Sequence, residues 1–262
     1  MGFAPDWLAL RASADRAARD PALLAQAGAT AGSMIVDLGA GTGATLRAMA
    51  DVVPDDTGWT LVDNDAALLA LTPRMGGRVR TVQADLTDLD ALPLAGAGLV
   101  TASALLDLVS NAWLDALVMR LVQHRLPLYA ALSYDGAMSW TPANDADHSV
   151  TLAFNRDQSS DKGFGPALGP AGALRARDRL AAAGYRVMLA ESPWQLGPRD
   201  DALQAELLHG IAAAATRAGH DAADSWLSAR MTALPNTQAR IGHIDLLALP
   251  PETNAATGKD TL

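Results

Sequence analysis

Short apolar runs alternate with segments of helical spacing along most of the chain. The runs are SMIVDL from residue 33, WTLVD over 59–63, VRTVQ over 79–83, GLVTAS over 98–103 and LPLYAAL over 126–132. Between them the apolar residues recur at helical spacing, over the longest stretch from 105 to 124. Apolar strands that alternate with helices are typical of a parallel sheet covered on both faces, with right-handed crossovers. The pattern therefore predicts an α/β fold.

Helical segments flank this alternating region. Residues 1–30 are predicted to form a helical cap that is broken at Pro21. The later elements are predicted as a helix over 171–184, a strand over 185–191, two helices within 200–233 and a closing strand over 239–249. We expect one domain over 1–249, followed by a flexible tail over 250–262.

The stretch 134–170 interrupts the alternation. It is rich in Asp, Asn, Ser, Gly and Pro. A loop of that length is uncommon within a compact domain unless it serves as a lid or a binding element. We therefore predict an inserted lid over 134–170 that contributes to the substrate side of a site.

Composition narrows the function classes. Hydrophobic residues make up 50% of the 262, which is ample for a core. The 29 acidic residues outnumber the 20 Lys and Arg, and the formal charge of -9 makes nucleic acid and anionic membranes poor partners. Cysteine is absent, which fits a reducing cytoplasm. Neither a signal peptide nor a membrane span is evident, so we expect a cytoplasmic protein, as a monomer or a homodimer.

The most informative motif lies between the first predicted strand and its helix. It reads Asp37-Leu38-Gly39-Ala40-Gly41-Thr42-Gly43, with glycine at alternate positions. Because glycine lacks a Cβ, such a backbone turns sharply and approaches a ligand closely. Asp63 ends the second strand 20 residues beyond Gly43, a spacing at which a carboxylate binds ribose hydroxyls, and Asp85 follows the third strand. The pattern predicts a nucleoside-type cofactor.

Two cofactor classes compete for this motif. Gly39-x-Gly41-x-x-Ala44 satisfies the dinucleotide fingerprint, so the glycines alone do not discriminate. The carboxylates of Asp37, Asp63 and Asp85 favour a cofactor that has a positive centre and no phosphate. S-adenosylmethionine is such a cofactor.

The order of motifs VDLGAGTG, LVDND, QADLTD and GLVTASALLDLVS, within 33–133, resembles the class I S-adenosylmethionine-dependent methyltransferases. The resemblance implies a Rossmann-like, seven-stranded, mostly parallel sheet with helices on both faces. It also implies that the closing strand over 239–249 is inserted antiparallel between the fifth and sixth strands. The expected activity is the in-line transfer of a methyl group, with release of S-adenosylhomocysteine.

The resemblance also implies roles for residues around the cofactor. The acid before the glycines and the glycine loop hold the methionine part, the acid after the second strand binds the ribose, and the acid after the third strand meets the adenine. In this chain these and the flanking positions are Asp37, Gly39, Ala40, Gly41, Gly43, Asp63, Asn64, Asp85, Leu86 and Ser103. Arg11 is a further candidate, for the cofactor carboxylate, if the first helix folds over the site; otherwise it is a surface arginine.

The substrate side is less specific. No Asn/Asp-Pro-Pro-Tyr/Phe sequence follows the fourth strand, which argues against the enzymes that methylate exocyclic amino groups and for a small-molecule acceptor. A general base is optional because positioning supplies much of the acceleration of methyl transfer. The catalytic candidates are His148, Tyr134 and Asp135. The substrate candidates are Asp107, Trp140, Asn155, Asp161 and Lys162. The alternatives are polar loop contacts for His148, turn roles for the aspartates and core packing for Trp140.

Two other functions fit the sequence. One is a non-catalytic protein that binds S-adenosylmethionine as a sensor or partner subunit. The other is an NAD(P)-dependent oxidoreductase, in which Asp63 would hold the ribose. The histidines show no metal-ligand spacing and cysteine is absent, so no metal site is predicted.

Overall fold

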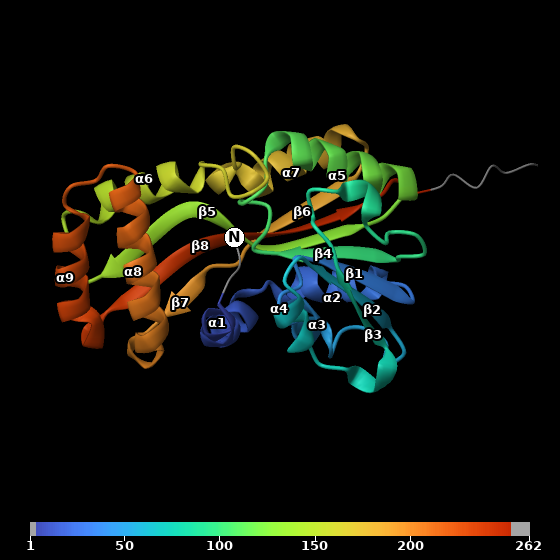
Figure 1. The fold of residues 1–262 in the computed structure, drawn as a ribbon, viewed down its shortest axis with the longest axis horizontal. Coiled ribbons are helices and arrows are strands. Elements are labelled where there is room, and N and C mark those ends of the chain that lie inside the picture. The colour runs from blue at the N-terminus through green and yellow to red at the C-terminus, as the bar shows by residue number, and fades with distance from the viewer. Residues whose placement is uncertain (1–3, 253–262) are drawn as a thin grey trace, which may run out of the picture.

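The computed structural model describes residues 4–252, and Figure 1 shows their arrangement. The strands are β1 (Met34–Leu38), β2 (Gly58–Asp63), β3 (Val79–Gln83), β4 (Leu99–Ser103), β5 (Leu128–Thr141), β6 (Arg186–Glu191), β7 (Trp194–Leu196) and β8 (Gln238–Leu249). The α-helices are α1 (Pro5–Ala18), α2 (Pro21–Thr30), α3 (Ala44–Met49), α4 (Ala66–Ala70), α5 (Asn111–His124), α6 (Asp147–Gln158), α7 (Gly172–Ala182), α8 (Asp201–Arg217) and α9 (Ala223–Ala233). The predicted tail lies outside the described residues from 253 onward.

Within the described chain, one sheet of eight strands forms the centre of the molecule, in the order β3-β2-β1-β4-β5-β8-β6, with β7 paired to β8 off this path. Strands β1 to β5 are parallel, and β8 runs antiparallel between β5 and β6. The α/β class and the position of the closing strand are therefore confirmed. The expected number of seven strands is wrong, because β7 adds an eighth. Its three residues are too few to show a strand period in the sequence.

The sheet is buried on both faces because successive side chains of each strand point to opposite sides. Val36 and Val100 pack in the cluster that contains residues of α5 and α7. Ile35 and Leu99 pack on the other side, with residues of α2, α3 and α4. Figure 1 shows these two helical layers above and below the strands.

The predicted N-terminal helical cap is present as α1 and α2. The break between them falls where predicted, since Pro21 is the first residue of α2. The side chain of Asp20 caps α2 by accepting a hydrogen bond from the backbone N–H of Leu23 at 2.8 Å. On the other side of this turn, α1 packs against β7 and α8.

A third hydrophobic cluster lies at the outer end of the sheet. It is formed by α6, α8 and α9 with β7 and the outer halves of β5 (134–141) and β8 (238–243), which we call the outer lobe. In Figure 1 the outer lobe lies at the left. Within the predicted lid over 134–170, residues 134–141 continue β5, residues 147–158 form α6, and an irregular segment over 159–168 follows.

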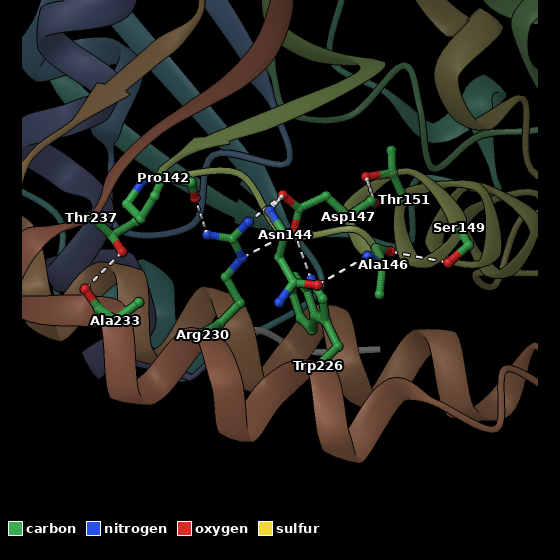
Figure 2. Close-up of polar contacts among 10 residues, drawn as sticks. All are labelled: Pro142, Asn144, Ala146, Asp147, Ser149, Thr151, Trp226, Arg230, Ala233 and Thr237. Carbon is green, nitrogen blue, oxygen red and sulfur yellow. Dashed lines mark hydrogen bonds and ion pairs between the residues drawn. The ribbon is translucent and has the colours of Figure 1, made fainter.

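A buried ion pair fastens the outer lobe (Figure 2). Arg230 of α9 is 2% exposed, and its guanidinium binds both carboxylate oxygens of Asp147 and the carbonyl oxygen of Pro142. Asp147 also accepts a hydrogen bond from the indole N–H of Trp226 at 2.8 Å. The guanidinium lies 5.2 Å from the ring centroid of Trp140. These contacts join α6, α9 and the end of β5.

None of the helices within residues 4–252 combines the length and the apolar character that a membrane crossing requires. In the same part of the chain, no group of three or more His, Asp or Glu side chains is placed to hold a metal ion.

Candidate functional site

The glycine loop follows β1 at the carboxyl edge of the sheet. Gly39, Gly41 and Gly43 have φ values of 67°, 52° and 81°, in the left-handed region that other residues rarely adopt. A Cβ at Gly41 would lie 3.3 Å from Cδ1 of Leu8. The loop therefore turns tightly beneath α1 and leaves its backbone open to a ligand.

Asp63 is fixed at the end of β2 beside this loop. Its Oδ2 accepts a hydrogen bond from the backbone N–H of Gly41 at 2.8 Å, and its Oδ1 accepts one from the backbone N–H of Asp65 at 3.0 Å. A carboxylate has about four lone-pair sites, so acceptor capacity remains on both oxygens. The carboxylate can thus order the glycine loop and still bind hydroxyl groups of a ligand.

Asp37 lies underneath the loop rather than facing a cavity. It is 1% exposed, and its Oδ1 accepts a hydrogen bond from the hydroxyl of Thr101 at 2.7 Å. Burial raises the pKa of Asp37 to about 6, against the lowering effects of Thr101 and the Arg19 charge. Arg19 itself is buried and donates to the hydroxyl of Ser103 at 2.9 Å. This polar cluster supports the loop from below.

A cavity of about 380 Å³, the glycine-loop pocket, opens above the loop. The sequence-predicted residues that line it are Arg11, Gly39, Ala40, Gly41, Asp63, Asn64, Asp85, Leu86, Ser103 and Lys162. Gly43 stands outside the lining and begins α3 as its N-terminal cap. Hydrogen bonds from Thr87 lower the pKa of the exposed Asp85. The structure thus brings most of the predicted cofactor residues together.

Each of the two cationic side chains that line this pocket forms an ion pair with a carboxylate. Arg11 forms an ion pair with Asp15, with N–O distances of 2.8 and 3.1 Å. Lys162 forms one with Asp157 at 3.0 Å. Since Asp63 and Asp85 also line the pocket, its lining has an excess of negative charge. Such a lining disfavours a pyrophosphate and favours a ligand with a positive centre.

A second cavity of about 420 Å³, the aromatic pocket, adjoins the first, and both are lined by Arg11, Ala104 and Leu108. Its floor consists of buried side chains, among them Asp107, Tyr134, Trp194, Ile241 and His243. Exposed residues of α8 line its rim, among them Glu206, His209 and Arg217. A closed floor and an open rim are typical of a small-molecule site.

Backbone strain occurs at the junction of the two pockets. Ala104 and Leu132 have φ values of 51° and 57°, which are uncommon for residues with a side chain. Ala104 follows β4 and lines both pockets, and Leu132 of β5 lines the aromatic pocket. Strained backbone of this kind is concentrated at functional sites, because the surrounding structure must hold it in place.

Asp107 is the acidic group on the floor of the aromatic pocket. It is 8% exposed, and its Oδ1 has no hydrogen-bond partner among the described residues. Burial raises its pKa to about 6, although backbone hydrogen bonds of Asp107 and Tyr134 and the charge of Arg11 each lower it. This carboxylate faces a cavity with unused capacity to accept a hydrogen bond.

His243 lines the same pocket from β8. Its ring is 5.1 Å from that of Trp194 and 6.3 Å from that of Tyr134, its partner across the strands. Burial, with a smaller contribution from the charge of Arg11, lowers the pKa of His243 to about 3, so the imidazole is neutral at pH 7. Its Nδ1 has no hydrogen-bond partner among the described residues.

Of the catalytic and substrate candidates, Tyr134, Asp107 and Lys162 line a pocket. Asn155 supports the aromatic pocket from behind, since its Oδ1 accepts a hydrogen bond from the hydroxyl of Tyr134 at 2.8 Å. Asp161 shapes the 159–168 segment by accepting from the backbone N–H groups of Gly163 and Gly165.

Like Asn155 and Asp161, three further candidates line neither pocket. His148 is exposed on α6, where the helix turns it toward solvent. Trp140 is buried in the core of the outer lobe, 5.4 Å from the ring of Trp226. Asp135 turns to its own strand and accepts a hydrogen bond from the backbone of Ala137.

Sequence reasoning missed several residues of the aromatic pocket, chiefly His243 and the α8 side chains Glu206 and Arg217. His243 was detectable as a polar residue within the apolar strand ARIGHIDLLAL. The α8 residues carry no local signal, because only the packing of the outer lobe brings that helix over the pocket.

Asp157 connects the surroundings of the two pockets. Its carboxylate binds Arg217, which lines the aromatic pocket, and Lys162, which lines the glycine-loop pocket. Burial alone would raise the pKa of Asp157, but the hydrogen bonds from Arg217 and Lys162 lower it below its usual value. This ionised carboxylate holds α6, α8 and the 159–168 segment together.

Comparisons with known proteins bear on the fold. No protein-family model matches the chain, and no curated protein matches it in sequence. Its structure is similar to that of a cyclopropane-fatty-acyl-phospholipid synthase-like protein from Lactobacillus casei, with a TM-score of 0.59, 15% identity and 95% of each chain covered. It is also similar to the cyclopropane synthase MmaA2 from Mycobacterium tuberculosis, with a TM-score of 0.49, 13% identity, and coverage of 87% of this chain and 83% of that one.

The likeness to the Lactobacillus casei protein extends over almost the whole of both chains. Together with the strand order, it confirms the Rossmann-like fold that the resemblance to class I S-adenosylmethionine-dependent methyltransferases implies.

Proposed function

We propose that this chain is an S-adenosylmethionine-dependent methyltransferase whose acceptor is a small molecule bound in the aromatic pocket. The observation that carries the proposal is the pairing of two adjoining cavities. One is acidic and built on the glycine loop, and the other is apolar with a closed floor. A methyl donor and an acceptor must lie next to each other for in-line transfer.

The glycine-loop pocket fits the cofactor in shape and charge. The open backbone at Gly39 and Gly41 receives the amino-acid part, in a space that a Cβ at Gly41 would narrow. Asp63 accepts hydrogen bonds from the ribose, while Asp85 and Leu86 contact the adenine. Arg11, which α1 places over the loop, is the residue that binds the carboxylate of the cofactor. When bound, the cofactor supplies a methyl group on a positively charged sulfur.

The protein contributes to the transfer chiefly through position and the exclusion of water. Ala104 and Leu108 line both cavities and set the boundary between donor and acceptor. The buried floor around Tyr134 and Trp194 removes the acceptor from solvent, which strengthens the electrostatic interactions there. Orientation of this kind supplies a large share of the rate enhancement.

The test is calorimetric titration with S-adenosylhomocysteine, with NADH titrated in parallel. We expect micromolar binding of S-adenosylhomocysteine and none of NADH. Binding of NADH alone would overturn the proposal in favour of an oxidoreductase.

A second measurement separates an enzyme from a non-catalytic binding protein. The protein and S-adenosylmethionine are incubated with a broad panel of metabolites, and products are sought by mass spectrometry. A methylated product is expected. Tight cofactor binding without any methylated product would instead favour a sensor or a partner subunit.

A further inference from the structure

The charges of the aromatic pocket are unequally neutralised. Arg11 is paired with Asp15, and Arg217 is held by both oxygens of Asp157. Asp107 and Glu206 also line the cavity, and neither forms an ion pair within residues 4–252. Because the two cations are matched and the two acids are not, the cavity presents a net negative charge to a ligand.

The two acids differ in their setting. Glu206 is exposed at the rim, where water screens its charge. Asp107 is buried on the floor, and its Oδ1 has no partner. A buried carboxylate without an ion-pair partner is costly to the fold, and a cationic ligand that donates to it reduces that cost. A positively charged group of a ligand therefore gains the most binding free energy at the floor of the pocket.

The walls around Asp107 are apolar and partly aromatic. Tyr134 and Phe154 lie edge to face at 5.5 Å, and Met138 and Ile211 also line the cavity. The face of Trp194 is already covered by Arg11, whose guanidinium carbon is 4.9 Å from the ring centroid. The remaining surface suits a flat apolar body and offers little to a strongly hydrated one.

We propose that the aromatic pocket binds a primary or secondary amine in its cationic form, on a flat apolar body, with the ammonium group donating a hydrogen bond to the carboxylate of Asp107. This inference rests on the proposed function, because it names the class of acceptor for the methyl group. The ammonium nitrogen has no lone pair, so it must first lose a proton, to the carboxylate of Asp107 or to water. The neutral nitrogen can then form a bond to the methyl carbon as the carbon–sulfur bond of S-adenosylmethionine breaks and S-adenosylhomocysteine leaves. Asp107 selects the ligand by charge, and the walls select it by shape.

The experiment compares three probes of similar size on the unaltered protein in the presence of S-adenosylhomocysteine. They are 2-phenylethylamine, 2-phenylethanol and 3-phenylpropionate, which are cationic, neutral and anionic. Calorimetry is expected to show at least about tenfold tighter binding of the amine than of the alcohol, equivalent to about 1.4 kcal/mol, and weakest binding of the acid. Equal binding of amine and alcohol, or a preference for the acid, would overturn the inference.

Three variants locate the recognition. Asp107→Asn keeps the shape of the side chain and is expected to abolish the preference for the amine while S-adenosylhomocysteine still binds. Asp55→Asn removes an exposed carboxylate that lines neither cavity, and is expected to retain the preference. Glu206→Gln is also expected to retain it. If Glu206→Gln alone abolishes the preference, the ammonium group lies at the rim and the assignment to Asp107 is wrong.

The outcomes separate this inference from the proposed function. Failure of S-adenosylhomocysteine to bind the unaltered protein would remove the proposed function itself. Binding of S-adenosylhomocysteine without a preference for the amine would remove only the inference. Because the three probes are first compared on the unaltered protein, the result stands even if Asp107→Asn does not fold.

Discussion

Asp107→Asn should alter the pH dependence of stability in a direction that the burial of this carboxyl sets. Its pKa is raised from 3.8 to about 6 in the folded protein. An acid with a higher pKa in the folded than in the unfolded chain binds its proton more tightly when folded. The wild-type protein therefore loses stability from this group as the pH rises from about 4 to about 6. Asparagine does not titrate and avoids this loss.

The magnitude follows from the same values. The pKa of Asp107 is about 2 units higher in the folded than in the unfolded chain. Each unit corresponds to 1.36 kcal/mol, so the complete loss of folding stability from this group is about 3 kcal/mol. Between pH 4 and pH 7.5 the free energy of unfolding of Asp107→Asn, relative to wild type, should rise by about 2–3 kcal/mol. The neighbouring groups Arg11, Tyr134 and His243 are present in both proteins, so their own titration largely cancels.

Urea denaturation of both proteins at pH 4 and pH 7.5, without ligand, measures this quantity. A constant effect of the substitution, such as an imperfectly bonded amide, is the same at both pH values and drops out of the comparison. Asp55→Asn is the matched control and should stay within about 0.5 kcal/mol of wild type at both. If the free energy of unfolding of Asp107→Asn relative to wild type is the same or lower at pH 7.5 than at pH 4, the description of Asp107 as a buried, unpaired carboxylate is wrong.

Three further predictions concern the cofactor and the outer lobe. Asp63→Asn should weaken S-adenosylhomocysteine binding by about 10–100-fold, since hydrogen bonds to a charged group contribute about 1.5–3 kcal/mol; calorimetry that shows unchanged affinity would remove Asp63 from the site. Gly41→Val should abolish that binding, because φ is +52° there and Leu8 is 3.3 Å from the added Cβ, while circular dichroism shows a retained fold. Arg230→Leu should lower the free energy of unfolding by about 3 kcal/mol, because it leaves Asp147, whose side chain is only 15% exposed, without its cation. The matched control is Arg240→Leu, at an exposed ion pair, with an expected loss of at most about 1 kcal/mol in the same urea titration.

The alternation of apolar runs and helical spacings was enough to predict the order of the main elements and the fold class. Both features are local, because a strand buried on two faces needs an unbroken apolar run and its covering helix needs one apolar stripe. The glycine-loop pocket was predictable for a similar reason. In a parallel sheet the segments after β1, β2 and β3 meet at one edge, so residues such as Gly41, Asp63 and Asp85 converge wherever that fold forms.

The outer lobe and the aromatic pocket were decided by the tertiary structure. In the outer half of β5 buried and exposed positions are mixed and the pairing with β8 shifts register, so the sequence 134–141 carries no apolar run. Arg11, Asp107, Trp194 and His243 come from four distant parts of the chain. The burial of these side chains, and the shifted pKa values of Asp107 and His243, exist only once α1, the segment after β4, β7 and β8 are packed together, because a side chain's charge state depends on which neighbours exclude water from it.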